Sequence, residues 1–346
     1  MKAPSIRTSY RPLVKLGNVH DFREKQSRSM MGDRRDGRFY RYTKEIKLAV
    51  NVALAVGRPV LLTGVSGGGK STLAFNLARI MKRRYYEFVV TSRSQARDLF
   101  YRFDAVRRLG EAQWRQPSKE DVISADERDE SWQSKYPYLE PGPLWWMLDR
   151  EGARRRGYSG VGKLPFAEAL DPARPHDDQD KPPGSKKPPK ELSGSVLLID
   201  EIDKADPDFP NNLLVPLGSW EFTVEELGIP INLPRKEGVH PLDHPLVIVT
   251  SNRQRELPDT FLRRCIVLDM TPPDAAELVK IALAAFGPKR KKFYEKIAKL
   301  VSDHHNGTNL SVAEYLDAVQ AIDKLHASND ALAQIVGTAS WRSPQP

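Results

Sequence analysis

The chain has 346 residues, of which 40% are hydrophobic and 29% charged, so it is long enough to bury a substantial core in about two domains. No apolar run approaches the roughly 18 residues of a membrane-spanning helix, and the basic N-terminus lacks the apolar stretch of a secretory signal. A single cysteine, Cys265, excludes an internal disulfide. We therefore expect a cytoplasmic protein without membrane insertion, whose net charge of +9 keeps nucleic acid among the partners to consider.

The first part of the chain changes character near residue 39. Residues 1–38 are polar and basic, which predicts a flexible N-terminal arm that orders only on contact. Apolar residues then recur at helical spacing from Ile46 to Ala55 and stop at Gly57, which predicts a helix ended by this glycine.

Short apolar runs alternate with helical patterns over the next two hundred residues. They predict strands at 58–63, 87–91, 196–200 and 246–250, and helices at 71–81 and 95–109. Strands that alternate with helices indicate a parallel sheet covered on both faces. Residues 39–270 are therefore predicted to be an α/β core.

Two other segments differ from this core. Residues 151–195 are rich in proline and charge, which predicts a surface insertion that is at least partly disordered; a partner-docking loop is the alternative. After Pro272 and Pro273 the apolar spacing is helical to the end, so residues 271–346 are predicted to form a small all-α domain.

A phosphate-binding motif lies between the first strand and its helix. Residues 64–71 read G-V-S-G-G-G-K-S and fit G-x-x-x-x-G-K-[ST]. Backbone N–H groups in such a loop cradle phosphates at the positive end of the helix, while the lysine neutralises charge and the hydroxyl binds Mg²⁺. The predicted binding residues are Gly64, Val65, Ser66, Gly67, Gly68, Gly69, Lys70, Ser71 and Thr72. The alternative is a glycine-rich turn before an ordinary helix.

Two carboxylates follow the apolar strand V-L-L-I at 196–199. Asp200 is predicted to hold Mg²⁺ together with Ser71, and Glu201 to act as the general base that polarises a water. A strand that ends in a charged turn is the alternative. Asp200 lies 130 positions after Lys70, which leaves room for another strand and its helices.

Polar residues also follow the strand at 246–250 and a later short helix. Asn252 is predicted to contact the γ-phosphate or the attacking water, unless it only turns the chain. Arg263 and Arg264 lie too far along the fold to reach the nucleotide of their own subunit easily. They are predicted to reach that of a neighbour as an arginine finger.

Together these motifs resemble the AAA+ ATPases, and in detail their MoxR-type branch. The resemblance runs from about Tyr42 to Gln320 and includes the specific segments T-S-R-S-Q-A-R-D-L and L-P-D-T-F-L-R-R-C. It implies an AAA+ αβα sandwich with a helical lid, binding of ATP and Mg²⁺, and a homo-oligomeric ring that is usually hexameric. It also implies remodelling of a protein client, often beside a partner with a von Willebrand A domain.

The resemblance assigns roles to the motif residues and shows one departure. Gly64, Gly69, Lys70 and Ser71 take the Walker A positions, Asp200 and Glu201 the Walker B pair, Asn252 the first sensor, and Arg264 the finger, with Arg263 in reserve. Many members also carry a second-sensor arginine in the lid. The matching stretch, residues 310–314, has none.

Other interpretations of the chain stay open. A nucleic-acid motor or loader fits the basic charge, and a nucleotide-gated assembly module would need turnover only incidentally. Trp145 and Trp146 are expected in the core or an interface, with a client anchor as the alternative. Tyr40 and Tyr42 are candidates for contact with adenine, and Cys265 is expected to be a buried strand thiol.

Overall fold

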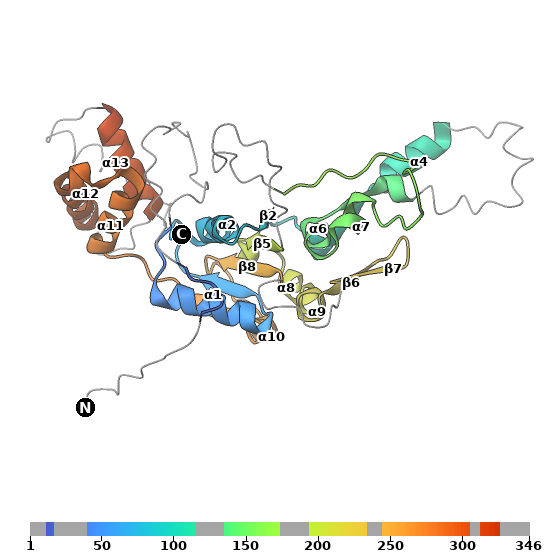
Figure 1. Ribbon diagram of the computed structural model, residues 1–346, viewed down its shortest axis with the longest axis horizontal. Coiled ribbons are helices and arrows are strands. Elements are labelled where there is room, and N and C mark those ends of the chain that lie inside the picture. Colours follow the sequence, from blue (N-terminus) through green and yellow to red (C-terminus); the bar gives the residue numbers. More distant parts are fainter. Residues whose placement is uncertain are drawn as a thin grey trace, which may run out of the picture.

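The structure is a computed structural model that describes residues 12–16, 40–114, 135–173, 194–233, 244–304 and 312–325. Within these residues, five parallel strands form the central sheet in the order β2-β5-β8-β1-β9 (Figure 1). The strands are β1 (Val60–Thr63), β2 (Arg84–Val89), β5 (Ser195–Asp200), β8 (Leu246–Ser251) and β9 (Ile266–Asp269). Because all five run in one direction, Thr63, Asp200 and Ser251 lie at the same edge of the sheet.

Side chains alternate between the two faces of this sheet, as the two-residue period of a strand requires. On β1, Leu61 packs in one hydrophobic cluster with Trp145, whereas Leu62 packs in another with Leu73. The helices that cover the two faces are α1 (Lys44–Val56) and α2 (Lys70–Ile80) on one, and α6 (Pro143–Leu148) on the other. The predicted three-layer arrangement of helices, sheet and helices is confirmed.

The first helix begins and ends where its capping residues predict. Thr43 is its N-cap, and its hydroxyl accepts a hydrogen bond from the Ile46 N–H at 3.3 Å. Gly57 ends it with φ 66°, a left-handed conformation that glycine adopts without steric cost. The chain can therefore turn directly into β1.

The predicted helix at 95–109 is wrong, because a strand interrupts it. The chain instead forms α3 (Ala96–Phe100), β3 (Tyr101–Phe103) and α4 (Ala105–Trp114). Strand β3 pairs antiparallel with β4 (Leu139–Pro141), so a distant segment overrides the local helical pattern. The 3₁₀ turn η1 (Tyr136–Tyr138) leads into β4, and α4 extends away from the central sheet (Figure 1).

Part of the predicted insertion is folded. Helix α7 (Arg150–Arg154) begins it, and Arg150 forms an ion pair with Asp171 at 2.7 Å. The N–H of Ala169 donates to the carbonyl of Arg154 at 2.9 Å, so residues 155–173 return along this helix. The remaining part of the insertion, 174–193, lies outside the described residues.

Short elements connect β5 to β8 and β8 to β9. They are η3 (Ile202–Lys204), α8 (Asp208–Asn212), α9 (Leu214–Ser219), the antiparallel hairpin β6 (Glu221–Val224) and β7 (Ile229–Asn232), and α10 (Asp259–Leu262). The hairpin packs through Phe222 against Trp145, with ring centroids 6.0 Å apart. It therefore extends the hydrophobic cluster beneath α6 beyond the sheet.

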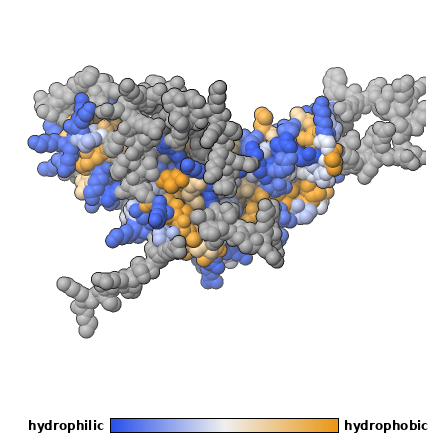
Figure 2. Space-filling view, viewed as in Figure 1, coloured by the Kyte–Doolittle hydropathy of each residue, from blue (hydrophilic) through white to orange (hydrophobic). Residues whose placement is uncertain are grey.

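Three helices follow β9 and pack around a hydrophobic cluster of their own. They are α11 (Ala275–Phe286), α12 (Lys291–His304) and α13 (Val312–Leu325), with the 3₁₀ turn η5 (Pro288–Arg290) between the first two. We call them the helical unit; in the view of Figure 2, most of its visible residues are hydrophilic, with some hydrophobic ones among them. The predicted boundaries at 38 and 270 stay predictions.

A short part of the N-terminal arm lies against the first helix. The Asn51 side chain accepts from the N–H of Val14 at 2.9 Å and donates to its carbonyl at 3.3 Å. Leu16 is buried in the cluster beneath α1, so residues 12–16 are attached to the core, and the rest of 1–38 lies outside the described residues. None of the helices that the structure describes is both long and apolar enough to cross a bilayer.

Candidate nucleotide site

The glycine loop connects β1 to α2 at the carboxyl edge of the sheet. Gly64 has φ 135°, and a Cβ atom there would lie 2.5 Å from the carbonyl oxygen of Met270. Gly69, the N-cap of α2, has φ 83°, and the ring of Tyr40 lies 3.6 Å from its Cβ position. A side chain at either position would strain the loop, so both positions need glycine. Without side chains there, the backbone N–H groups of the loop can approach a phosphate group.

Lys70 is held inside this loop. Its Nζ donates to the carbonyl oxygens of Gly64 at 2.8 Å and Val65 at 2.7 Å. Burial lowers the pKa of Lys70, and the carboxylates of Asp200, Asp203 and Glu201 partly offset that effect. These contacts hold the ammonium group at the loop. Of the other predicted loop residues, Ser66 is exposed, and Gly67, Gly68 and Thr72 are half-buried.

The structure brings Ser71 and Asp200 together, although 129 residues separate them. The Ser71 hydroxyl lies 2.8 Å and 3.0 Å from the two Asp200 oxygens, and the Thr250 hydroxyl donates to Oδ1 of Asp200 at 2.6 Å. In the described part of the chain, no group of three or more His, Cys, Asp or Glu side chains could hold a metal ion by itself. Magnesium usually binds one or two carboxylates plus substrate phosphates, so this oxygen pair fits Mg²⁺.

Glu201 lies beside that pair in a strained conformation. Its φ of 61° and ψ of 49° are left-handed, and its N–H donates to the Thr250 hydroxyl at 2.8 Å. Its Oε1 accepts from the Asn252 amide at 3.1 Å, and Oε2 accepts from Lys204 at 2.5 Å. Backbone strain in a non-glycine residue persists only where surrounding contacts hold it, and such residues cluster at functional sites.

Two residues at the end of β8 were not found from the sequence. Thr250 is fully buried and connects Asp200 to the backbone of Glu201. Arg253, with φ 59°, reaches across β1, where its Nη2 lies 3.2 Å from the Thr63 hydroxyl and 2.7 Å from Oδ1 of Asp269. The available signal was a polar pair, Thr250 and Ser251, ending an otherwise apolar strand.

Arg263 and Arg264 lie at the opposite edge of the sheet. Ile266, the first residue of β9, pairs with Val60, and its N–H donates to the carbonyl of Pro59 at 2.8 Å. The two arginines precede it and are exposed. Strand β1 rises about 3.3 Å per residue, so at least about 10 Å separates that edge from the end of β1. Neither arginine therefore joins the Lys70 and Asp200 group within one chain.

The helical unit touches the loop without an arginine. The N–H of Val312, the first residue of α13, donates to the carbonyl of Gly67 at 3.1 Å. Arg41 forms an ion pair with Glu277 of α11 at 3.1 Å, between the segment before α1 and the helical unit. The helical unit thus contacts the loop through the backbone of Val312, next to the stretch 310–314 that lacks a second-sensor arginine.

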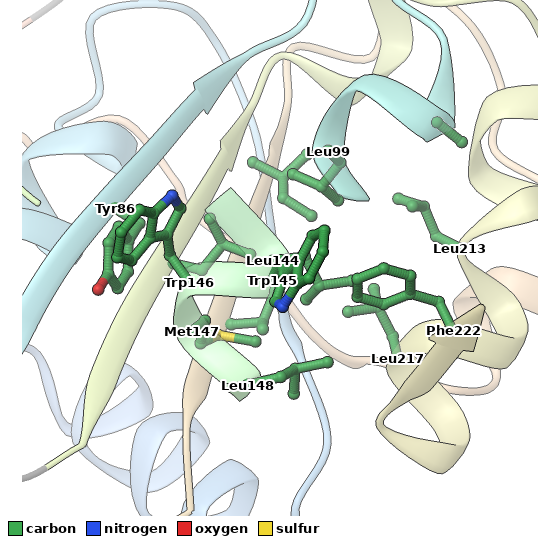
Figure 3. Close-up of a cluster of buried hydrophobic side chains, with 14 of the residues drawn as sticks. Tyr86, Leu99, Leu144, Trp145, Trp146, Met147, Leu148, Leu213, Leu217 and Phe222 are labelled. Atoms are coloured by element: carbon green, nitrogen blue, oxygen red, sulfur yellow. The ribbon is translucent and has the colours of Figure 1, made fainter. Parts of the chain in front are cut away.

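The aromatic candidates divide between core and site. Trp145 and Trp146 are buried among Leu144, Met147 and Phe222 (Figure 3), so core packing is confirmed and the client-anchor alternative is wrong. The Tyr42 hydroxyl donates to Oδ1 of Asn76 at 2.5 Å and is buried, which leaves Tyr40 beside the loop. Cys265 is buried, and burial raises the pKa of its thiol to about 12.

The sequence and the fold of this chain resemble parts of known proteins. Residues 59–124 match the model of the AAA domain of the dynein-related subfamily, and no curated protein sequence matches the chain. Similar solved structures are a candidate ATPase from Cytophaga hutchinsonii (11% identity, TM-score 0.37) and two Thermotoga maritima proteins. These two are the RuvB Holliday junction branch migration motor (14%, 0.41) and domain III of the replication initiation protein DnaA (11%, 0.39).

These alignments cover 72%, 86% and 88% of this chain, and 56%, 66% and 95% of the respective other chains. The chain thus spans between about half and two thirds of the ATPase and RuvB structures. With TM-scores below 0.5 and identities of 11–14%, these likenesses carry no argument about this chain. The parallel sheet and the loop between β1 and α2, together with the AAA domain match over residues 59–124, agree with the predicted AAA+ P-loop NTPase fold of the core.

A methyl group at two loop positions tests the geometry. Gly64→Ala places Cβ against the Met270 backbone and should lower the free energy of unfolding by about 1–3 kcal/mol and abolish nucleotide binding. Gly68→Ala is the matched control for stability, because its Cβ meets nothing closer than 3.4 Å. Urea unfolding and titration with a fluorescent ATP analogue measure both effects. Equal stability of the two variants would contradict the close approach.

Proposed function

We propose that the protein is a MoxR-like AAA+ ATPase that hydrolyses ATP with Mg²⁺ and acts as a homo-oligomeric, hexameric ring. The observation that carries the proposal is the contact between Ser71 of the loop and Asp200 of β5, with Glu201 and Asn252 directly beside it. The AAA domain match over residues 59–124 supports the same activity.

The residues of this site divide the work of hydrolysis. The N–H groups of residues 65–70 and the Lys70 ammonium would hold the phosphates, and Ser71 and Asp200 would hold Mg²⁺. When bound, Mg²⁺ would neutralise negative charge on the phosphates. Glu201 takes a proton from the attacking water, and the Asn252 amide orients the Glu201 carboxylate at 3.1 Å.

The positive charge that completes the site, an arginine near the γ-phosphate, comes from a second subunit. Arg264, with Arg263 in reserve, lies exposed at the amino edge of the sheet, whereas the loop lies at the carboxyl edge. An arginine that cannot reach the site of its own chain can complete the site of a neighbour. Hydrolysis would then depend on assembly, as a ring requires.

The work done by the ring follows from the MoxR-type resemblance. We propose that hydrolysis remodels or assembles a cytoplasmic protein client, with a von Willebrand A domain protein as the partner to test first. If ATP binding alone organises the complex, the protein is instead an assembly module, and a variant that binds but does not hydrolyse ATP would keep its biological activity.

A nucleic-acid client is the second candidate, favoured by the charge of α12. This helix and the turn before it carry six cations and two acids: Lys289, Arg290, Lys291, Lys292, Lys296, Lys299, Glu295 and Asp303. The six cations are exposed, while Ile297 and Ala298 are buried in the helical unit. Protein interfaces are depleted in lysine, so this face suits a hydrated phosphate backbone better than a protein partner.

Mixing two inactive variants tests the ring proposal. Glu201→Gln should bind ATP but lose at least about 100-fold in kcat, and Arg264→Ala should bind ATP with a similar loss. In a mixed ring, an intact Glu201 meets an intact Arg264 of its neighbour, so ATPase activity should partly return. No recovery at any mixing ratio would contradict a finger in trans. Arg263→Ala separates the two candidate fingers: if Arg264 is the finger, this variant should keep most of the activity.

Salt dependence tests the second candidate. The triple variant Lys292→Gln, Lys296→Gln and Lys299→Gln should lose nucleic-acid affinity and flatten the dependence of log K on log salt by about 2–3. Lys82→Gln, Lys163→Gln and Arg93→Gln remove equal charge from exposed positions elsewhere. Fluorescence anisotropy with labelled single-stranded and duplex DNA, at several salt concentrations, measures the affinity and its salt dependence for each triple variant. Equal slopes for the two triple variants would exclude α12 as the binding face.

A further inference from the structure

A buried carboxylate next to the site, which also bears on the pKa of Lys70, has no assigned part in the hydrolysis proposed above. Asp203, in the turn η3 after β5, is 2% exposed. Its two oxygens accept from the N–H of Asn252 at 3.2 Å and 3.1 Å, and one of them accepts from the N–H of Gln254 at 2.9 Å. One carboxylate thus holds two backbone groups of the turn after β8.

That turn contains a strained residue. Arg253 lies between the two donors, and its φ of 59° is left-handed. A left-handed conformation is unfavourable for a residue with a Cβ atom, so other contacts must hold it. The Asp203 carboxylate accepts hydrogen bonds from the backbone on both sides of Arg253, and such bonds can hold the turn in this conformation.

The conformation of the turn decides where the Asn252 side chain lies. The Asn252 amide reaches Oε1 of Glu201 at 3.1 Å, from a backbone whose N–H is bound to Asp203. Asp203 and Glu201 also share one chain segment, in which the N–H of Lys204 donates to the Glu201 carbonyl at 3.0 Å. Asp203 therefore connects the segment after β5 to the turn after β8, and the Asn252 side chain connects that turn back to Glu201.

We propose that Asp203 is a positioning residue for hydrolysis, acting through Asn252 on Glu201. This inference rests on the proposed ATPase function. Both Asp203 oxygens are engaged by backbone N–H groups, so we assign it no contact with nucleotide or metal. Its effect should therefore fall on the rate of the chemical step and leave nucleotide binding unchanged.

The test replaces the carboxylate by an amide of the same size. In Asp203→Asn, the amide nitrogen cannot accept a hydrogen bond, so part of the turn loses its acceptor. We expect kcat to fall roughly 10- to 100-fold, as displaced catalytic groups typically cause, with KM within about 3-fold of wild type. Asp206→Asn is the matched control: Asp206 is exposed on the same segment, and its loss should change kcat by less than about 2-fold.

A double variant separates positioning from general damage to the fold. If Asp203 acts through Asn252, then Asp203→Asn should lower kcat by less than about 3-fold in an Asn252→Ala background. If the two substitutions instead lower kcat by the product of their separate effects, the inference is overturned. Unchanged kcat in Asp203→Asn alone would also overturn it. Should Asp203→Asn not fold, Asp203→Glu keeps the charge but moves it by one methylene group, and it should lower kcat without changing KM; unchanged kcat there would also overturn the inference.

Hydrogen exchange distinguishes this inference from the proposed function. Absence of ATP turnover in the wild-type oligomer would overturn the proposed function. The placement of the turn is still measured by the exchange of the Asn252 and Gln254 amides. Faster exchange in Asp203→Asn than in Asp206→Asn supports the role of Asp203, and equal exchange in the two variants contradicts it.

Discussion

The site depends on the contact between the Ser71 hydroxyl and the Asp200 carboxylate, which joins two segments 129 residues apart. Neither partner makes this contact by local structure alone. The sheet order sets β8 between β5 and β1, and α2 packs back over β5, so the start of α2 lies above the end of β5. Every other group of the site is placed relative to this contact, including Thr250, Glu201 and Asn252.

The two edges of the sheet separate the groups to which the proposed function assigns the reaction. Phosphate loop, acidic pair and amide lie at the carboxyl edge, where parallel strands end together. Arg263 and Arg264 lie at the other edge, beside the start of β9. The separation is fixed by strand length, so no rotation of a side chain removes it. If one of these arginines serves the reaction, the complete site therefore needs a second subunit.

Sequence reasoning found the parts of this arrangement that local patterns encode. The glycine loop, the apolar run before Asp200 and the helix ended by Gly57 each have a signal within a few residues. It failed at 101–103, because β3 forms only by pairing with β4, nearly 40 residues later. It also missed Thr250, Arg253 and Asp203, because their roles come from contacts across strand ends that spacing in the chain does not report. The roles assigned to the predicted site residues stay predictions.

The most direct test of the central contact is calorimetric titration of ATP with and without Mg²⁺. If Ser71 and Asp200 together hold the metal, wild-type protein should bind ATP at least about 10-fold more tightly with Mg²⁺ than with excess EDTA. Asp200→Asn should lose most of that difference while the loop still binds the phosphates. Equal affinity in both conditions for the wild-type protein, or no heat of binding at all, would contradict a metal site built from these two residues.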